Sequence, residues 1–111
     1  MGHTESYKEF KEKTARYSQK DWRNINLMLM QNFIEFGKLL EESPESHAAQ
    51  VQVRKLQDTI TENYYHCTKE ILAGLGQMYS LDGRFIENID KTGGPGTAEF
   101  AGKAIAYYCT H

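Results

Sequence analysis

The stretch that decides the fold covers residues 18–40 and reads SQKDWRNINLMLMQNFIEFGKLL. Its apolar residues recur at spacings of three and four, which is typical of an amphipathic helix. They form two neighbouring stripes, with Trp22, Ile25, Leu29, Phe33, Phe36 and Leu40 in the first and Leu27, Met30 and Ile34 in the second. Because two stripes make much of the circumference apolar, we expect other helices to cover this one on more than one side.

A capping motif precedes this long helix. The Ser18 hydroxyl can accept a hydrogen bond from the backbone N–H of Asp21, and the Asp21 carboxylate can accept one from Ser18 in return. Tyr17 and Trp22 occupy the two positions of a hydrophobic staple. The sequence therefore predicts that the helix begins directly after Ser18. The segment before it, from Thr4 to Arg16, is rich in Lys and Glu and has few apolar side chains, which predicts a loosely attached helix.

The next helix is predicted from the proline at position 44. Residues 43–45 read SPE, which supplies an N-cap, a proline at the first helical position and an acid near the positive helix end. We expect this helix to begin there and to run to about Tyr65. One face at helical spacing carries Ala49, Val53, Leu56, Ile60, Tyr64 and Cys67. This face predicts a side that packs into the core, with the Cys67 thiol on it.

Three shorter helices are predicted in the last third of the chain. Thr68 and Asp82 are N-cap residues for two of them, and the loop GGPG at 93–96 ends the second. Thr97 starts the last helix, which is rich in small residues that allow close approach to neighbours: Ala98, Ala101, Gly102, Ala104 and Ala106. Segments with the alternating pattern of strands are not found. The sequence therefore predicts an all-α, compact domain of about five to six helices with a loosely attached N-terminal helical segment.

Composition excludes several classes of protein. The 111 residues suit a single domain, for which we take residues 4–111. The formal net charge of −2 and the pI near 6.1 lack the basic excess of a free-standing nucleic-acid-binding domain. A mean hydropathy of −0.65 and the absence of an apolar run near 20 residues argue against a membrane partner. Since no secretory signal is visible, we expect the chain in the cytoplasm.

Metal and thiol chemistry find little support in the sequence. The pairs His66-Cys67 and Cys109-Thr110-His111 contain the ligand types of a zinc site, but adjacent residues on a helix point about 100° apart. For the same reason His66 is badly placed to activate Cys67 as a nucleophile. A disulfide bond between Cys67 and Cys109 is an open alternative, although reduced thiols are favoured. We therefore expect no metal, no haem, no other cofactor and no enzymatic activity.

The aromatic and Met side chains are more numerous than a thin helical domain can easily bury. Seven Tyr, five Phe, one Trp and four Met occur in the chain. Most of them are expected in the core. Because Met and Tyr also form adaptable binding walls, the surplus predicts an apolar groove.

Several short blocks occur in fixed order along nearly the whole chain: KEKTA at 11–15, KDW at 20–22, YHCTKEI at 65–71, GQMY at 76–79, DGRF at 82–85, NID at 88–90 and AI at 104–105. Together they resemble the antibiotic-recognition domain of TipA-type regulators, the thiostrepton-induced branch of the MerR family. The resemblance implies a globin-like fold that binds bulky hydrophobic antibiotics, above all macrocyclic thiopeptides, in a cleft between helices. It also implies that residues 4–17 are mobile until ligand orders them, in agreement with their composition.

The resemblance also implies a site and a wider context. We expect the cleft to be lined by Trp22, Tyr64, Tyr65, His66, Gly74, Met78, Tyr79 and Phe85, with Cys67 as a thiol that ligand could contact. In the family, a cysteine that attacks the dehydroalanine of some thiopeptides lies at the position of Gly74, so reversible binding is expected here. The DNA-binding half of such regulators is not in this chain. The domain is then either the drug-sensing part of a regulator or a stand-alone version that sequesters the drug and confers resistance.

Two other functions compete with antibiotic binding. The groove could accept a partner helix, or the coiled coil of its own regulator, in which case the chain is a protein-interaction module. A covalent trap or thiol enzyme based on Cys67 is the other alternative.

Overall fold

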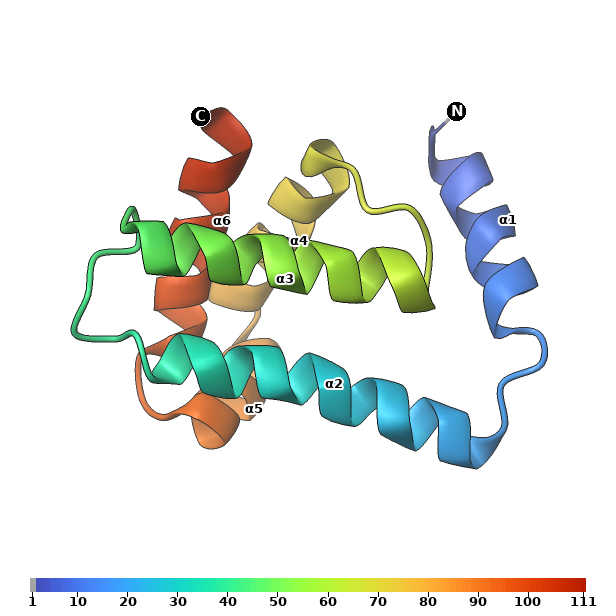
Figure 1. The fold of residues 1–111 in the computed structure, drawn as a ribbon, viewed down its shortest axis with the longest axis horizontal. Coiled ribbons are helices and arrows are strands. Elements are labelled where there is room, and N and C mark those ends of the chain that lie inside the picture. The colour runs from blue at the N-terminus through green and yellow to red at the C-terminus, as the bar shows by residue number, and fades with distance from the viewer. Residues whose placement is uncertain (1) are drawn as a thin grey trace.

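Helices α2 and α3 lie side by side in one layer, and α4, α5 and α6 lie behind them (Figure 1). The structure, a computed structural model, describes residues 2–111, with side chains from Tyr7 onward. In this part of the chain the helices are α1 (Gly2–Thr14), α2 (Gln19–Gly37), α3 (His47–Asn63), α4 (Lys69–Leu81), α5 (Gly83–Gly93) and α6 (Thr97–Thr110). No strand is formed by residues 2–111, so the predicted all-α fold is confirmed. None of these helices is both long and apolar enough to cross a membrane.

The predicted caps are present where the helices begin. Ser18 Oγ accepts from the Asp21 N–H at 3.2 Å, and the Asp21 carboxylate accepts from the Ser18 N–H at 3.0 Å. The rings of the predicted staple, Tyr17 and Trp22, lie 5.3 Å apart. Thr68 caps α4 and Asp82 caps α5. These caps satisfy N–H groups that have no partner inside their own helix, which is why short sequence signals located them correctly.

The predicted start of α3 was wrong by three residues. The helix begins at His47, not at Pro44, and its N-cap is Ser46, whose Oγ accepts from the Ala49 N–H at 3.2 Å. Residues 43–46 form a turn instead, closed by a hydrogen bond from the Ser46 N–H to the carbonyl of residue 43. The chain must reverse direction between the antiparallel helices α2 and α3, and this turn completes the reversal. A cap at Ser46 then leaves Ala49 fully buried.

The core lies between the two layers. On the predicted face of α3, Ala49, Val53, Leu56 and Ile60 are buried, whereas Tyr64 at the C-cap is half-buried. Helix α2 packs against α3, α5 and α6, as predicted, but Leu27 of its second stripe is 59% exposed. The cluster of buried apolar side chains comprises Phe33, Phe36, Ala49, Val53, Leu56, Ile60, Cys67, Leu72, Tyr79, Ile89, Ala98, Phe100, Ala101, Ala104 and Ile105. Cys67 joins this core from the connection between α3 and α4, not from α3 itself. Ala106, expected among the small residues of the α6 contact face, is exposed instead.

Glycines allow α4 and α6 to cross in direct contact. A Cβ on Gly76 of α4 would lie 2.7 Å from Ile105 Cγ2, and a Cβ on Gly102 of α6 would lie 2.6 Å from Ser80 Cβ. Both distances are shorter than any relaxed carbon–carbon contact. The small residues predicted for α6 therefore do allow it to pack closely against a neighbouring helix. That helix is α4, whose Gly76 also lies at the contact.

A buried polar network joins α2 to α3. Gln52 Nε2 donates to Asn32 Oδ1 at 2.8 Å, and Asn32 Nδ2 donates to Thr59 Oγ1 at 3.1 Å and to the Met28 carbonyl at 3.0 Å. Because a buried amide without partners costs about 1–3 kcal/mol, these bonds favour one register of the two helices over others.

Two glycines of α4 give opposite predictions. We expect Gly76→Ala to lower the free energy of unfolding by about 1–2 kcal/mol, because overpacking against Ile105 outweighs the better helix propensity of Ala. Gly74 is exposed, with no atom within 4 Å of a Cβ at that position. Gly74→Ala should therefore raise the free energy of unfolding by about 0.5–1 kcal/mol. Urea unfolding followed by circular dichroism measures both, and equal effects of the two variants would contradict the tight crossing.

Candidate functional site

Four aromatic rings gather where α1 meets the ends of α2 and α3. Phe10 of α1 lies 6.3 Å from Trp22 and is stacked on Tyr64 at 6.2 Å, and Trp22 lies 6.2 Å from Tyr64. Tyr17 contacts the edge of Trp22. We call Phe10, Tyr17, Trp22 and Tyr64 the aromatic cluster. Trp22 remains 37% exposed within it, so the cluster has an open side.

Polar side chains at the end of α1 and just after it donate hydrogen bonds to the C-terminal end of α3. Lys13 Nζ donates to the Thr61 carbonyl, and Tyr17 Oη, just after α1, donates to the Asn63 carbonyl at 2.7 Å. The last carbonyls of a helix have no partner within it and carry partial negative charge, so a lysine and a phenol are suitable donors to them. Otherwise α1 packs little against α2 to α6, and it stands at the edge of the molecule in Figure 1. The N-terminal helix is loosely attached.

Tyr79 sits mainly in the core. Its ring packs edge-on against Phe33 at 5.3 Å and lies 5.8 Å from Phe85, and only 6% of the residue is exposed. Burial raises the pKa of Tyr79, and negative charge on Tyr65, Cys67 or Tyr64 would raise it further. Cys67 and Tyr79 belong to the same cluster of buried side chains, and Tyr64 and Tyr65 pack against that cluster.

The exposed part of α4 carries two of the predicted site residues. Gly74 and Met78 are one helical turn apart, so they share a face, and Met78 is 37% exposed. The bare surface at Gly74 has open space above it. This face of α4 can therefore lie against a flat apolar group.

The thiols are poorly suited to chemistry. Cys67 is 1% exposed, and its burial, followed by the nearby Cys109, raises the pKa of its thiol to about 11. Burial also raises the pKa of Cys109, against a smaller opposite effect of Lys69. Both cysteines are free, and His66, beside Cys67 in sequence, is exposed. Among the described residues no three metal-ligating side chains come together.

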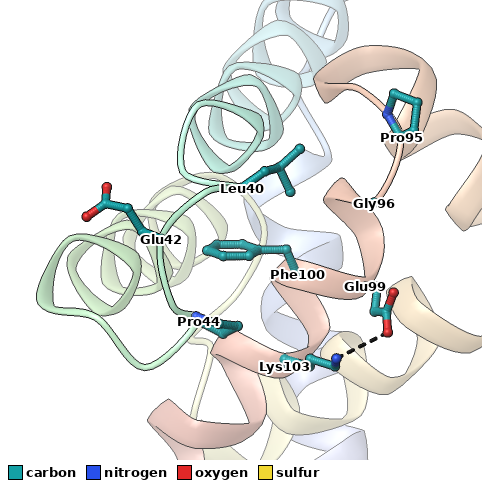
Figure 2. A pocket seen from close by; sticks show the side chains of 8 residues that line it. All are labelled: Leu40, Glu42, Pro44, Pro95, Gly96, Glu99, Phe100 and Lys103. Carbon is teal, nitrogen blue, oxygen red and sulfur yellow. Dashed lines mark ion pairs between the residues drawn. The ribbon is translucent and has the colours of Figure 1, made fainter.

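A surface hollow of about 340 Å³ lies at another place, between the connection that follows α2 and the start of α6 (Figure 2). It is lined by Leu40, Glu42, Pro44, Pro95, Gly96, Glu99, Phe100 and Lys103. Figure 2 shows Phe100 between the two connections and an ion pair of 3.2 Å between Lys103 and Glu99 at one side. None of the predicted site residues takes part in this hollow. Its lining comes from segments more than 50 residues apart, so no local pattern in the sequence could identify it.

The predicted site residues thus divide into three groups. Trp22 and Tyr64 meet in the aromatic cluster, Tyr79 and Phe85 meet at the edge of the core, and Gly74 and Met78 share the open face of α4. Tyr65 packs against the core. His66 is exposed, and no hydrogen bond or aromatic contact among the described residues joins it to these groups. Sequence reasoning missed Phe10 as a member of the aromatic cluster. Its position among the few apolar side chains of α1 was the signal that could have found it.

Comparison with known proteins gives consistent results over almost the whole chain. The TipAS antibiotic-recognition domain family matches residues 1–108. The HTH-type transcriptional activator mta of Bacillus subtilis is 33% identical over 103 residues, which cover 93% of this chain and 40% of that protein. The HTH-type transcriptional activator TipA of Streptomyces coelicolor is 35% identical over 106 residues, covering 94% and 42%. The chain thus spans about two fifths of the length of these relatives.

A solved structure agrees with the family match. TipAS in complex with nosiheptide, from a thiopeptide antibiotic resistance system of Streptomyces lividans, has a TM-score of 0.83 and 33% sequence identity. The match covers 98% of this chain and 77% of that one. It confirms the fold that the sequence blocks implied. By sequence and by structure, this chain belongs to the TipAS antibiotic-recognition domain family.

Proposed function

We propose that this chain is the ligand-sensing domain of a transcription regulator, or a stand-alone version of it, and binds bulky hydrophobic antibiotics such as thiopeptides between its helices. The observation that carries the proposal is the match over 98% of the chain to a domain in complex with nosiheptide. The proposal treats residues 4–111 as one recognition domain without cofactor, metal or catalytic activity. It places the domain in the cytoplasm, where a regulator with a DNA-binding half would act.

The proposed cleft lies between α1 and the open face of α4. The aromatic cluster would form one wall, Gly74 and Met78 the other, and Tyr65, Tyr79 and Phe85 the floor, with His66 and Cys67 at the margin. Support comes from the exposed side of Trp22 and the open space at Gly74. Apolar surface buried by a ligand stabilises the complex by roughly 25 cal/mol per Å², reduced by the cost of ordering protein and ligand.

The proposed mechanism includes closure of α1 over the ligand. An isolated helix shorter than about 12–15 residues is marginal in water, and α1 has 13 residues. Its tertiary contacts are the Phe10 ring and the donors to the end of α3. We infer that residues 4–17 are mobile without ligand and that a ligand adds the apolar surface that keeps α1 in place.

The state of the thiols supports reversible binding. A nucleophilic attack needs a thiolate, and a thiol with a pKa of about 11 is protonated at neutral pH. Gly74 provides no thiol on the open face of α4. We therefore assign binding to packing and hydrogen bonding, not to a covalent bond.

Nosiheptide should change the emission of Trp22, which is the single Trp of the chain, and the change should saturate at one ligand per chain. Tyr64→Ala should weaken binding about tenfold or more, because it removes a ring from the proposed wall. Tyr107→Ala is the matched control, since Tyr107 stacks on His111 at the end of α6, away from the aromatic cluster. Unchanged emission and unchanged amide NMR shifts at the highest soluble nosiheptide concentration would refute thiopeptide binding.

Hydrogen exchange should separate α1 from the other helices. Without ligand, we expect the amides of α1 to exchange at nearly unprotected rates, while those of α3 and α6 exchange many times more slowly. Saturating nosiheptide should slow exchange in α1 by about tenfold or more. Mass spectrometry after peptic digestion measures this, and full protection of α1 without ligand would show that it is not a mobile cover.

The thiol pKa values predict selective alkylation. At pH 7.5, iodoacetamide should modify Cys109 before Cys67, and the rate at Cys67 should rise with pH towards 11, because a raised pKa leaves the thiol protonated below that value. Incubation with nosiheptide should leave the intact mass of the chain unchanged. A nosiheptide adduct that disappears in Cys67→Ser would instead establish covalent capture.

A further inference from the structure

Apart from Tyr7, which is 62% exposed, and Tyr107, which stacks on His111, the tyrosine hydroxyls fall into two groups. Tyr17 donates to the Asn63 carbonyl at 2.7 Å, and Tyr108 donates to Gln57 Oε1 at 2.8 Å. The hydroxyls of Tyr64, Tyr65 and Tyr79 form no hydrogen bond with any of the described residues. The first group serves the fold, whereas the second has unused donors and acceptors.

Tyr79 is the unusual member of the second group. It is 94% buried, and its ring fits between Phe33 and Phe85, so a phenylalanine would pack in the same way. Within the described residues, no polar side-chain atom that is shut off from solvent lacks a partner. The unpartnered hydroxyl of Tyr79 must therefore reach accessible space. A nearly buried ring thus keeps a hydroxyl that is not fully shut off from solvent.

No side chain that is ionised at neutral pH contributes to the raised pKa of the Tyr79 hydroxyl. The groups whose charge would act on Tyr79 are Tyr65, Cys67 and Tyr64, and no Lys, Arg, Asp or Glu is among them. Burial raises the pKa values of all three tyrosines, so each carries its proton at neutral pH and can donate it to a hydrogen bond. An ionic ligand group would be desolvated there without a counter-charge, whereas a neutral acceptor would not suffer that cost.

We propose that Tyr79 is a specificity-determining residue that donates a hydrogen bond from its hydroxyl to an amide carbonyl of a peptide-type ligand, with the hydroxyls of Tyr64 and Tyr65 beside it. This inference rests on the proposed function and adds a polar contact to its apolar cleft. The donor is held by its packed ring, so little freedom is lost when the bond forms. Ligands that place a carbonyl over Tyr79 are favoured over apolar ligands of equal size.

The first test compares Tyr79→Phe with Tyr108→Phe. Tyr79→Phe should weaken nosiheptide binding by about five- to thirtyfold in isothermal titration, because one buried hydrogen bond is lost, and should leave the unfolding midpoint in urea unchanged or higher. Tyr108→Phe should lower that midpoint, because Gln57 Oε1 loses its donor, and should leave the affinity unchanged. A loss below fivefold in Tyr79→Phe overturns the inference, and so does a drop in midpoint like that of Tyr108→Phe.

The second test needs no antibiotic. In protein labelled with ¹³Cζ-tyrosine, N-methylacetamide serves as the smallest peptide carbonyl. The Tyr79 resonance, assigned by its absence in Tyr79→Phe, should shift with N-methylacetamide concentration, whereas the Tyr108 resonance should not. No shift at Tyr79 overturns the inference. If the wild-type chain fails to bind nosiheptide but Tyr79 responds to N-methylacetamide, thiopeptide binding fails while the role of Tyr79 stands.

Discussion

The crossing of α4 over α6 is the contact on which the rest of the structure depends. Gly76 meets Ile105 and Gly102 meets Ser80 with no space for a Cβ on either glycine. In a chain of 111 residues, such direct contact lets three short helices form one solid layer behind α2 and α3. Every predicted site residue on α4 is placed by this layer. This layer also holds the buried ring of Tyr79 in place.

The molecule joins this rigid part to an N-terminal helix of a different character. Helices α2 to α6 share a core and a buried amide network, whereas α1 is held by the Phe10 ring and by donors to the unsatisfied carbonyls of α3. In the function proposed above, the solid layer would position a bulky ligand, and α1 would adapt to its shape. This division suits a receptor that responds to ligands of different shapes better than a uniformly rigid cavity would.

The proposed recognition uses apolar surfaces and hydrogen bonds, not a covalent bond. The Cys67 thiol is buried and protonated, and the open face of α4 carries glycine at position 74. The aromatic cluster offers apolar surface, and the unpartnered tyrosine hydroxyls offer directional hydrogen bonds. The relatives mta and TipA are HTH-type transcriptional activators, of which this chain spans about two fifths of the length.

The sequence by itself determined the helical class, the caps at Ser18, Thr68 and Asp82, the buried face of α3 and the family, because caps and periodicity act over one or two turns of helix. Only the tertiary structure decided where α3 begins, since the turn that reverses the chain competes with the proline signal at position 44. It also decided that Phe10 completes the aromatic cluster, that Tyr79 is a core ring with an accessible hydroxyl, and that a hollow forms beside Phe100. These features depend on contacts between segments distant in the chain, and such contacts are set by how the helices cross.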